Sequence, residues 1–138
     1  MDLFPRVLWA ISLESVIAEK FDAILERMSY TSRMKDFFDL YDLSQRYKFD
    51  GRVLQEAILE TLRNRGRIFE KDTMQIIQAF QFDASMNTKW NHFCKTVQTN
   101  IPFNIVITRI VVFLEPIFNV ILKEEEFFGE WTVDGKWN

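Results

Sequence analysis

Residues 12–28 read SLESVIAEKFDAILERM, and their apolar side chains recur at the spacing of an amphipathic helix. The apolar stripe consists of Leu13, Val16, Ile17, Phe21, Ile24, Leu25 and Met28. Side chains three and four residues apart lie on one face of an α-helix, and an apolar face of this kind is buried against the protein. Ser12 precedes the stripe and can cap the helix by accepting a hydrogen bond from a free backbone amide. We therefore expect a helix over about residues 13–28.

The same period recurs along the chain, so the predicted fold is mostly α, with about six helices in a single domain spanning residues 1–138. The other helices are expected at about 33–46, from Asp50 to Gly66, after Asp72, at about 87–99, and at about 104–123 with a bend at Pro116. The side chains expected in the core are Phe21, Phe37, Leu54, Ile58, Trp90 and Phe113. From the 87–99 helix, Trp90, Phe93, Cys94 and Val97 should face inward.

The two ends of the chain are less regular. Residues 1–11 read as extended and could form an N-terminal edge strand. An aromatic tail follows the last helix and contains Phe127, Phe128, Trp131 and Trp137. With only 4 glycines and 3 prolines in 138 residues, the chain has too few turn-forming residues for a β-sandwich or barrel.

Composition also limits location and partners. The single cysteine, Cys94, cannot form an internal disulfide, and no secretory signal pattern opens the chain, so we expect a cytoplasmic location. A net charge of −3 gives no support for tight nonspecific binding of nucleic acid. No membrane association is expected, because polar residues interrupt the most apolar segment, 101–122. They are Asn104, Arg109, Glu115, Pro116 and Asn119.

Residues 33–40, RMKDFFDL, hold the densest group of candidate site residues. Asp36 and Asp39 are three apart and share one face of a helix, with Arg33 three before Asp36 and Lys35 four before Asp39. Ordinary surface ion pairs explain this spacing, and the pattern alone favours them. The functional alternative is a site where a carboxylate works on a metal or nucleotide while the basic residues meet phosphate.

Other residues with chemical potential are less specific. Lys20 lies beside the apolar stripe, where a lysine usually packs its stem and sends its ammonium to water. Asp22, two residues further on, should face another side of the helix. His92 has no second histidine or Cys-x-x-Cys partner, so no metal site is expected there. The four glycines stand apart and form no phosphate-binding loop, and no Asp-x-Asp pair lies on a predicted strand.

Two stretches taken together resemble the C-terminal region of AbiEii/AbiGii-type nucleotidyltransferase toxins. They are SLESVIAEKF at residues 12–21 and RMKDFFDL at 33–40. FDG at 49–51 and TLRNRG at 61–66 are also similar to that family, and the likeness extends from about Pro5 to residues 127–129. An Ala-x-Lys element followed by Arg-x-Lys-Asp-x-x-Asp-Leu is moderately specific as a pair.

The resemblance implies a polymerase-β-like nucleotidyltransferase that serves as the toxin of a toxin–antitoxin or phage-defence module. Full-length members have a Gly-Ser turn and an Asp-x-Asp pair that binds metal and nucleoside triphosphate, and later motifs add a lysine and an aspartate to the same cleft. Carried over, the catalytic residues would be Lys20 and Asp36. Arg33, Lys35 and Asp39 would bind nucleotide or phosphate, and Lys20 and Asp36 should lie within direct reach across facing helices.

The Gly-Ser turn and the Asp-x-Asp pair are missing from this sequence. The resemblance therefore predicts a truncated, C-terminal helical domain that is inactive alone and has no cofactor of its own, whereas the complete family protein would use magnesium and a nucleoside triphosphate. Its partners would be an antitoxin or an N-terminal nucleotidyltransferase half, and the complete protein could act on an RNA acceptor.

Two alternatives remain open at this stage. Arg63, Arg65, Arg67 and Lys71 could approach an RNA backbone, although a solvated helix end is the simpler use of such a cluster. The whole chain could also be a non-enzymatic protein-interaction module. It would then bind an antitoxin or partner subunit through its aromatic-rich C-terminal half and its N-terminal segment.

Overall fold

The structure is a computed structural model that describes residues 12–26 and 33–138. Within these residues the chain forms six α-helices and three short strands, which confirms the mostly α fold. The helices are α2 (Leu13–Glu26), α3 (Met34–Arg46), α4 (Gly51–Asn64), α5 (Thr73–Ala79), α6 (Ala84–Val97) and α7 (Phe103–Leu122), with a 3-10 turn, η1 (Phe80–Phe82), after α5. The expected N-terminal edge strand falls on residues 1–11, outside the described part.

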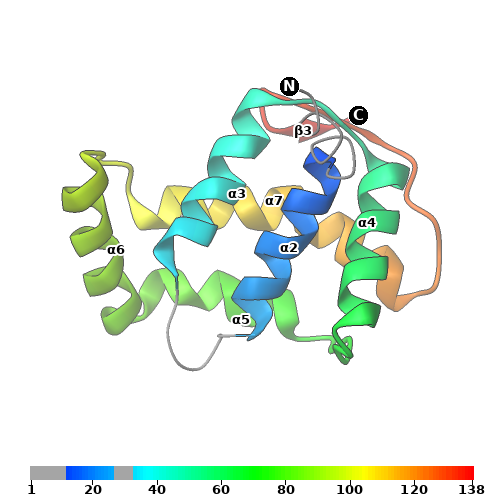
Figure 1. The fold of residues 1–138 in the computed structure, drawn as a ribbon, viewed down its shortest axis with the longest axis horizontal. Coiled ribbons are helices and arrows are strands. Elements are labelled where there is room, and N and C mark those ends of the chain that lie inside the picture. The colour runs from blue at the N-terminus through cyan, green and yellow to red at the C-terminus, as the bar shows by residue number, and fades with distance from the viewer. Residues whose placement is uncertain (1–11, 27–32) are drawn as a thin grey trace, which may run out of the picture.

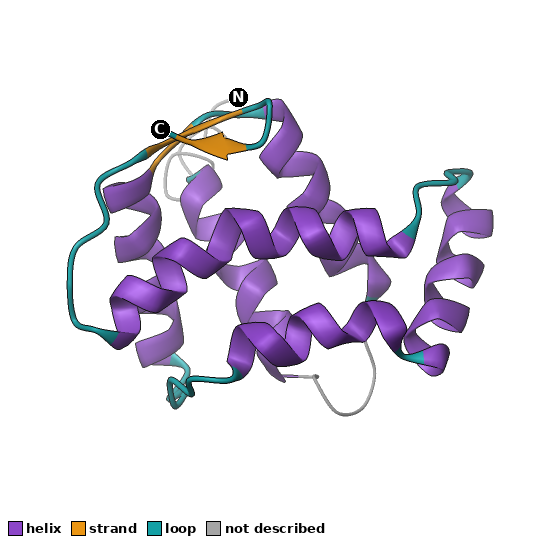
Figure 2. Cartoon of the chain, turned by 180° about the vertical axis from the view of Figure 1, so that it is seen from behind, coloured by secondary structure: helices purple, strands orange, loops and turns teal. Residues whose placement is uncertain are grey.

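The helices are arranged in two layers (Figure 1). In one layer α2 packs between α3 and α4, and α2 runs in the opposite direction to α3. The other layer contains α7, which crosses behind these helices and packs against α3, α4 and α5. From behind, α7 runs across most of the molecule with α5 beside it, and α6 stands at one end (Figure 2).

Helix α7 forms the centre of the core. Half of its 20 residues are buried, among them Ile107, Phe113 and Phe118. By length and composition alone α7 could cross a membrane, but here its apolar face packs against the other layer. The six side chains expected in the core are all buried, each with 1% exposure or less. Pro116 lies inside α7, and the helix continues beyond it; the bend expected there stays a prediction.

Local signals at the helix ends act as the sequence predicts. Ser12 Oγ accepts a hydrogen bond from the Ser15 amide at 3.0 Å, and Asp50 Oδ1 accepts from the amides of Arg52 and Val53. These side chains satisfy amides that have no partner inside their own helix. Gly66 follows α4 with a φ of +68°, a conformation that glycine adopts without strain.

The predicted helix over 87–99 is wrong at its start and on one face. It begins at Ala84, because Asp83 caps it by accepting from the Met86 amide at 2.8 Å. Val97, expected to face inward, is 43% exposed, since it lies in the last turn, past the part that packs on the core.

The aromatic tail forms part of a small sheet that the sequence analysis did not predict. Strand β1 (Phe49–Asp50) pairs antiparallel with β2 (Glu130–Thr132), which pairs with β3 (Lys136–Trp137). Trp131 is fully buried, and its indole donates to the Ser44 carbonyl at 2.8 Å. Trp131 is therefore part of the core, Phe127 and Trp137 pack against it, and Phe128 is 76% exposed.

Candidate functional site

Lys20 and Asp36 meet across the interface of α2 and α3. Lys20 Nζ lies 3.3 Å from Asp36 Oδ1 and 2.9 Å from Asp39 Oδ2. The predicted closeness of Lys20 and Asp36 is thereby confirmed, and its cause is the antiparallel packing of two helices whose facing sides carry these residues. Asp36 is nearly buried, with 8% of its side chain exposed, whereas Lys20 keeps 27%. The Lys20 side chain therefore keeps part of its surface accessible to solvent.

The pair of carboxylates sets the charge of Lys20. Burial opposes the charged form, but hydrogen bonds and charge attraction from Asp39 and Asp36 outweigh it and raise the pKa of Lys20 above its ordinary value. Burial likewise disfavours the Asp39 carboxylate, yet hydrogen bonds from Lys35 and Lys20 lower the pKa of Asp39. At neutral pH the cluster therefore contains a protonated lysine held by an ionised aspartate.

Lys20 and Asp36 border a charged cavity of about 270 Å³. Arg33, the residue before α3, lines the same cavity and has no ion pair with any described residue. Asp39 lies next to Lys20 but does not line the cavity, and Lys35 pairs with Asp39 at 2.8 Å on the surface with 70% of its side chain exposed. Of the five predicted site residues, the cavity thus brings together Lys20, Asp36 and Arg33.

A second charged group lines the cavity, and the sequence analysis missed it. Asp22 is buried, and it binds Arg67 Nε at 2.6 Å and Arg65 Nη1 at 3.0 Å. Both arginines come from the end of α4 and the loop after it. Asp22 and Arg65 line the cavity with Lys20, although Asp22 faces different partners from Lys20, as expected.

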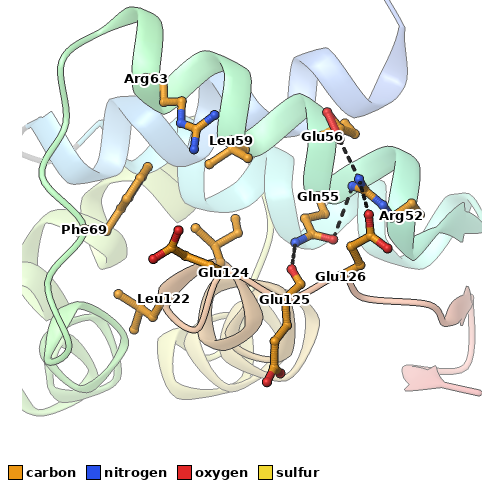
Figure 3. Close-up of a pocket in the computed structure, with 11 residues that line it drawn as sticks. Arg52, Gln55, Glu56, Leu59, Arg63, Phe69, Leu122, Glu124, Glu125 and Glu126 are labelled. Carbon is orange, nitrogen blue, oxygen red and sulfur yellow. Dashed lines mark hydrogen bonds and ion pairs between the residues drawn. The ribbon is translucent and has the colours of Figure 1, made fainter.

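The proposed basic patch for an RNA backbone does not hold together in the structure. Arg65 and Arg67 turn toward α2, where Asp22, Glu19 and Glu26 pair with them. Arg63 instead lies at a separate cavity of about 490 Å³ beside Leu59 and Phe69 (Figure 3). Their sequence spacing is that of a surface cluster, but the end of α4 and the following turn direct the side chains to different faces. The solvated-helix-end interpretation fails for Arg67, whose side chain is only 25% exposed, but Arg65 stays 48% exposed while it pairs with Asp22 and Glu19.

The donor atoms near Lys20 do not fit a metal ion. In residues 12–26 and 33–138 no group of three or more His, Cys, Asp or Glu side chains could hold one. The two nearest carboxylates, Asp36 and Asp39, already bind the Lys20 ammonium, and a cation at their centre repels a second cation. A magnesium ion for a family-type reaction would need donors from elsewhere.

Two further sequence candidates lie away from this cavity. His92 on α6 lines a different, mostly apolar cavity with Met34 and Phe93. Cys94 on the same helix is partly buried, and burial raises the pKa of its thiol, which makes it a poor nucleophile.

Together, fold and cavity define a small helical domain that presents a lysine–aspartate pair beside several guanidinium groups. Residues 2–105 match the family described as nucleotidyl transferase AbiEii toxin of type IV toxin–antitoxin systems, and this span is well over half of the chain. The chain therefore belongs to the AbiEii nucleotidyltransferase toxin family. No curated protein and no solved structure was found to match it.

Proposed function

We propose that this chain is the helical C-terminal domain of an AbiEii-type nucleotidyltransferase toxin and supplies Lys20 and Asp36 to a nucleotide-binding cleft. The observation that supports this role is the contact between Lys20 and Asp36 at the edge of a charged cavity. The two residues stand in the two motifs that resemble the family, 16 positions apart in the sequence, and they meet where α2 packs against α3.

In this proposal Lys20 contacts phosphate. Its raised pKa keeps it protonated, and its partial exposure allows a phosphate oxygen to approach. Asp36 positions the Lys20 ammonium from the protected side of the pair. Arg33, exposed at the start of α3, adds a second cation, because a guanidinium can bind two phosphate oxygens at once. Asp39 and Lys35 extend the network behind Lys20.

We further propose that the chain alone does not transfer nucleotides. Phosphoryl transfer depends on metal ions and on positioning of the triphosphate, and the described residues provide no set of donors for a metal. The metal-binding acids would come from an N-terminal nucleotidyltransferase half, and the acceptor of the complete protein would be RNA. Such a toxin would act in the cytoplasm, and its role would be phage defence.

The direct test is calorimetric titration with nucleoside triphosphate and magnesium, for the chain alone and with any neighbouring gene product that carries the Gly-Ser and Asp-x-Asp motifs. We expect Lys20→Met and Asp36→Asn to weaken nucleotide binding about tenfold, the effect of one lost charged hydrogen bond. The matched control is Lys95→Met, an exposed lysine on α6 outside the cavity, which should bind as the wild type does.

A labelling assay with nucleoside triphosphates, magnesium or manganese, and total RNA separates activity from binding. No transfer is expected for the chain alone. Robust labelling that disappears in Asp36→Ala and Lys20→Ala would show instead that this chain builds its own metal site.

The family implies an antitoxin, so a binding role for the chain follows from the same membership. The non-enzymatic alternative assigned binding to the aromatic C-terminal half, yet Trp131 is fully buried and Trp137 packs on Phe113 in the protein's own core. A lone gene, with no neighbouring reading frame that encodes the Gly-Ser and Asp-x-Asp motifs, would favour this alternative.

A further inference from the structure

The buried carboxylate of Asp22 holds two arginines in place. Only 1% of its side chain is exposed, and each of its oxygens accepts from a different guanidinium, Arg65 at 3.0 Å and Arg67 at 2.6 Å. A buried charge is costly unless it is paired and hydrogen-bonded, so this contact fixes both side chains against α2. Glu19 and Glu26 add two more carboxylates to this group, one at Arg65 and one at Arg67.

Arg65 is the arginine of this group that lines the cavity. It lines the cavity together with Lys20 and Arg33, whereas Arg67 does not. The three cations come from three places in the fold: α2, the residue before α3, and the residue after α4. The same cavity of about 270 Å³ is also lined by four carboxylates, so the three cations can bind an anion only through donors that these carboxylates leave free or release.

The acidic residues around Arg65 differ in how firmly they hold it. Glu19 pairs with Arg65 Nη2 at 2.6 Å, but both side chains are about half exposed. Exposed pairs of this kind contribute little to stability, so an anion can displace Glu19. Asp22, in contrast, is out of solvent and stays bound. Glu26 pairs with Arg67, and Asp36 is occupied by Lys20.

We propose that Arg65 is a phosphate-binding residue of this cavity and that Asp22 is the residue that positions it. The planar guanidinium keeps donors free while one edge is held by Asp22, and free guanidinium donors match the oxygens of a polyphosphate. The substrate class is a nucleoside triphosphate, bound through its phosphates. This inference rests on the proposed function, because it places Arg65 in the same cleft as Lys20.

The test titrates the full chain with tripolyphosphate at low ionic strength and measures affinity by calorimetry. We expect Arg65→Gln and Lys20→Met each to weaken binding about tenfold, as the loss of a charged hydrogen bond does. Arg63→Gln is the matched control: it removes the same charge two residues away, at the other cavity, and should change affinity less than twofold. Equal losses in Arg63→Gln and Arg65→Gln would overturn the proposal by showing a nonspecific charge effect.

The variants also separate this inference from the proposed function. Loss of binding in Lys20→Met but not in Arg65→Gln would overturn the role of Arg65 and leave the proposed function intact. Loss in Arg65→Gln but not in Lys20→Met would keep an anion site at Arg65 and contradict the role of Lys20. Wild-type affinity in both variants would contradict both.

The role of Asp22 is tested by whether Asp22→Asn weakens or tightens binding of the anion. If it acted only as a negative charge near the site, Asp22→Asn would tighten binding of an anion. If Asp22 positions Arg65, Asp22→Asn should instead weaken binding about threefold or more, because Arg65 loses its fixed geometry. If that variant does not fold, Glu19→Gln carries the test, since it frees Arg65 from its exposed partner and must tighten binding. Unchanged or weaker binding in Glu19→Gln would overturn the proposal.

Discussion

Lys20 and Asp22 stand two residues apart on α2, and the charged clusters around them have opposite compositions. Lys20 is a single cation held by the carboxylates of Asp36 and Asp39, whereas Asp22 is a single carboxylate held by two arginines. Their environments differ as much as their charges: 27% of the Lys20 side chain is exposed, against 1% for Asp22. The comparison shows how one helix can combine an accessible charged pair with a buried one that anchors the end of α4.

The largest expected effect on the free energy of unfolding is at Asp22, the buried carboxylate. Asp22→Ala should lower the free energy of unfolding by about 3–5 kcal/mol, because it removes two charged hydrogen bonds to a buried carboxylate, each worth about 1.5–3 kcal/mol. Urea denaturation measures this change. Glu19→Ala is the control on the same helix: its pair with Arg65 is exposed, and we expect a change of less than about 1 kcal/mol. Similar small losses in both would mean that Asp22 does not anchor the α4 end.

The next effect is at Asp36. Asp36→Ala should cost about 1–3 kcal/mol of unfolding free energy, since it removes a nearly buried partner of Lys20 while Asp39 remains in contact. The same denaturation assay applies. A loss as large as that of Asp22→Ala would contradict the difference in exposure between the two clusters.

A smaller effect is expected from pH. Because the folded pKa of Asp39 is lowered, its contribution to stability is present above its unfolded pKa, roughly 3.9, and is lost as pH falls through the folded value. Asp39→Asn should therefore be less stable than the wild type at neutral pH, and the difference should shrink only below about pH 4. Thermal unfolding of both proteins between pH 7 and pH 2 measures this. A difference that vanishes above pH 5 would contradict the lowered pKa.

The smallest effect is at the surface. Lys35→Ala removes an exposed ion pair between residues four apart on α3, and such pairs are worth about 0.3–0.5 kcal/mol. Denaturation in low and high salt should show a small loss that disappears when salt screens the pair. A salt-independent loss of more than about 1 kcal/mol would show that Lys35 has a structural role beyond that pair.

Local signals account for the parts of the fold that the sequence predicts. The caps Ser12 and Asp50 and the stop at Gly66 act within a few residues, so the sequence around each is sufficient. The contact of Lys20 with Asp36 was predictable because the two helices follow one another in the sequence, and such helices commonly pack side by side. Asp83 was missed as a cap because the apolar stripe of α6 begins later than the helix does.

Contacts between distant residues could not be predicted in this way. Arg65 and Arg67 lie 43 and 45 positions from Asp22, and nothing in a helical period tells which face the end of α4 turns toward. The sheet joins Phe49 to Trp131 through strands of two and three residues, too short to show an alternating pattern. The family resemblance did not indicate either feature.

The pairing of β1 with β2 also affects how the chain folds during its synthesis. Phe49 packs on Phe113, which in turn packs on Trp131 with ring centroids 4.6 Å apart. The ribosome adds about 5–20 residues per second, so the roughly 80 residues between the two strands take on the order of ten seconds to make. During that time β1 has no partner strand. A chaperone that binds exposed aromatic residues would therefore bind the nascent chain at Phe49.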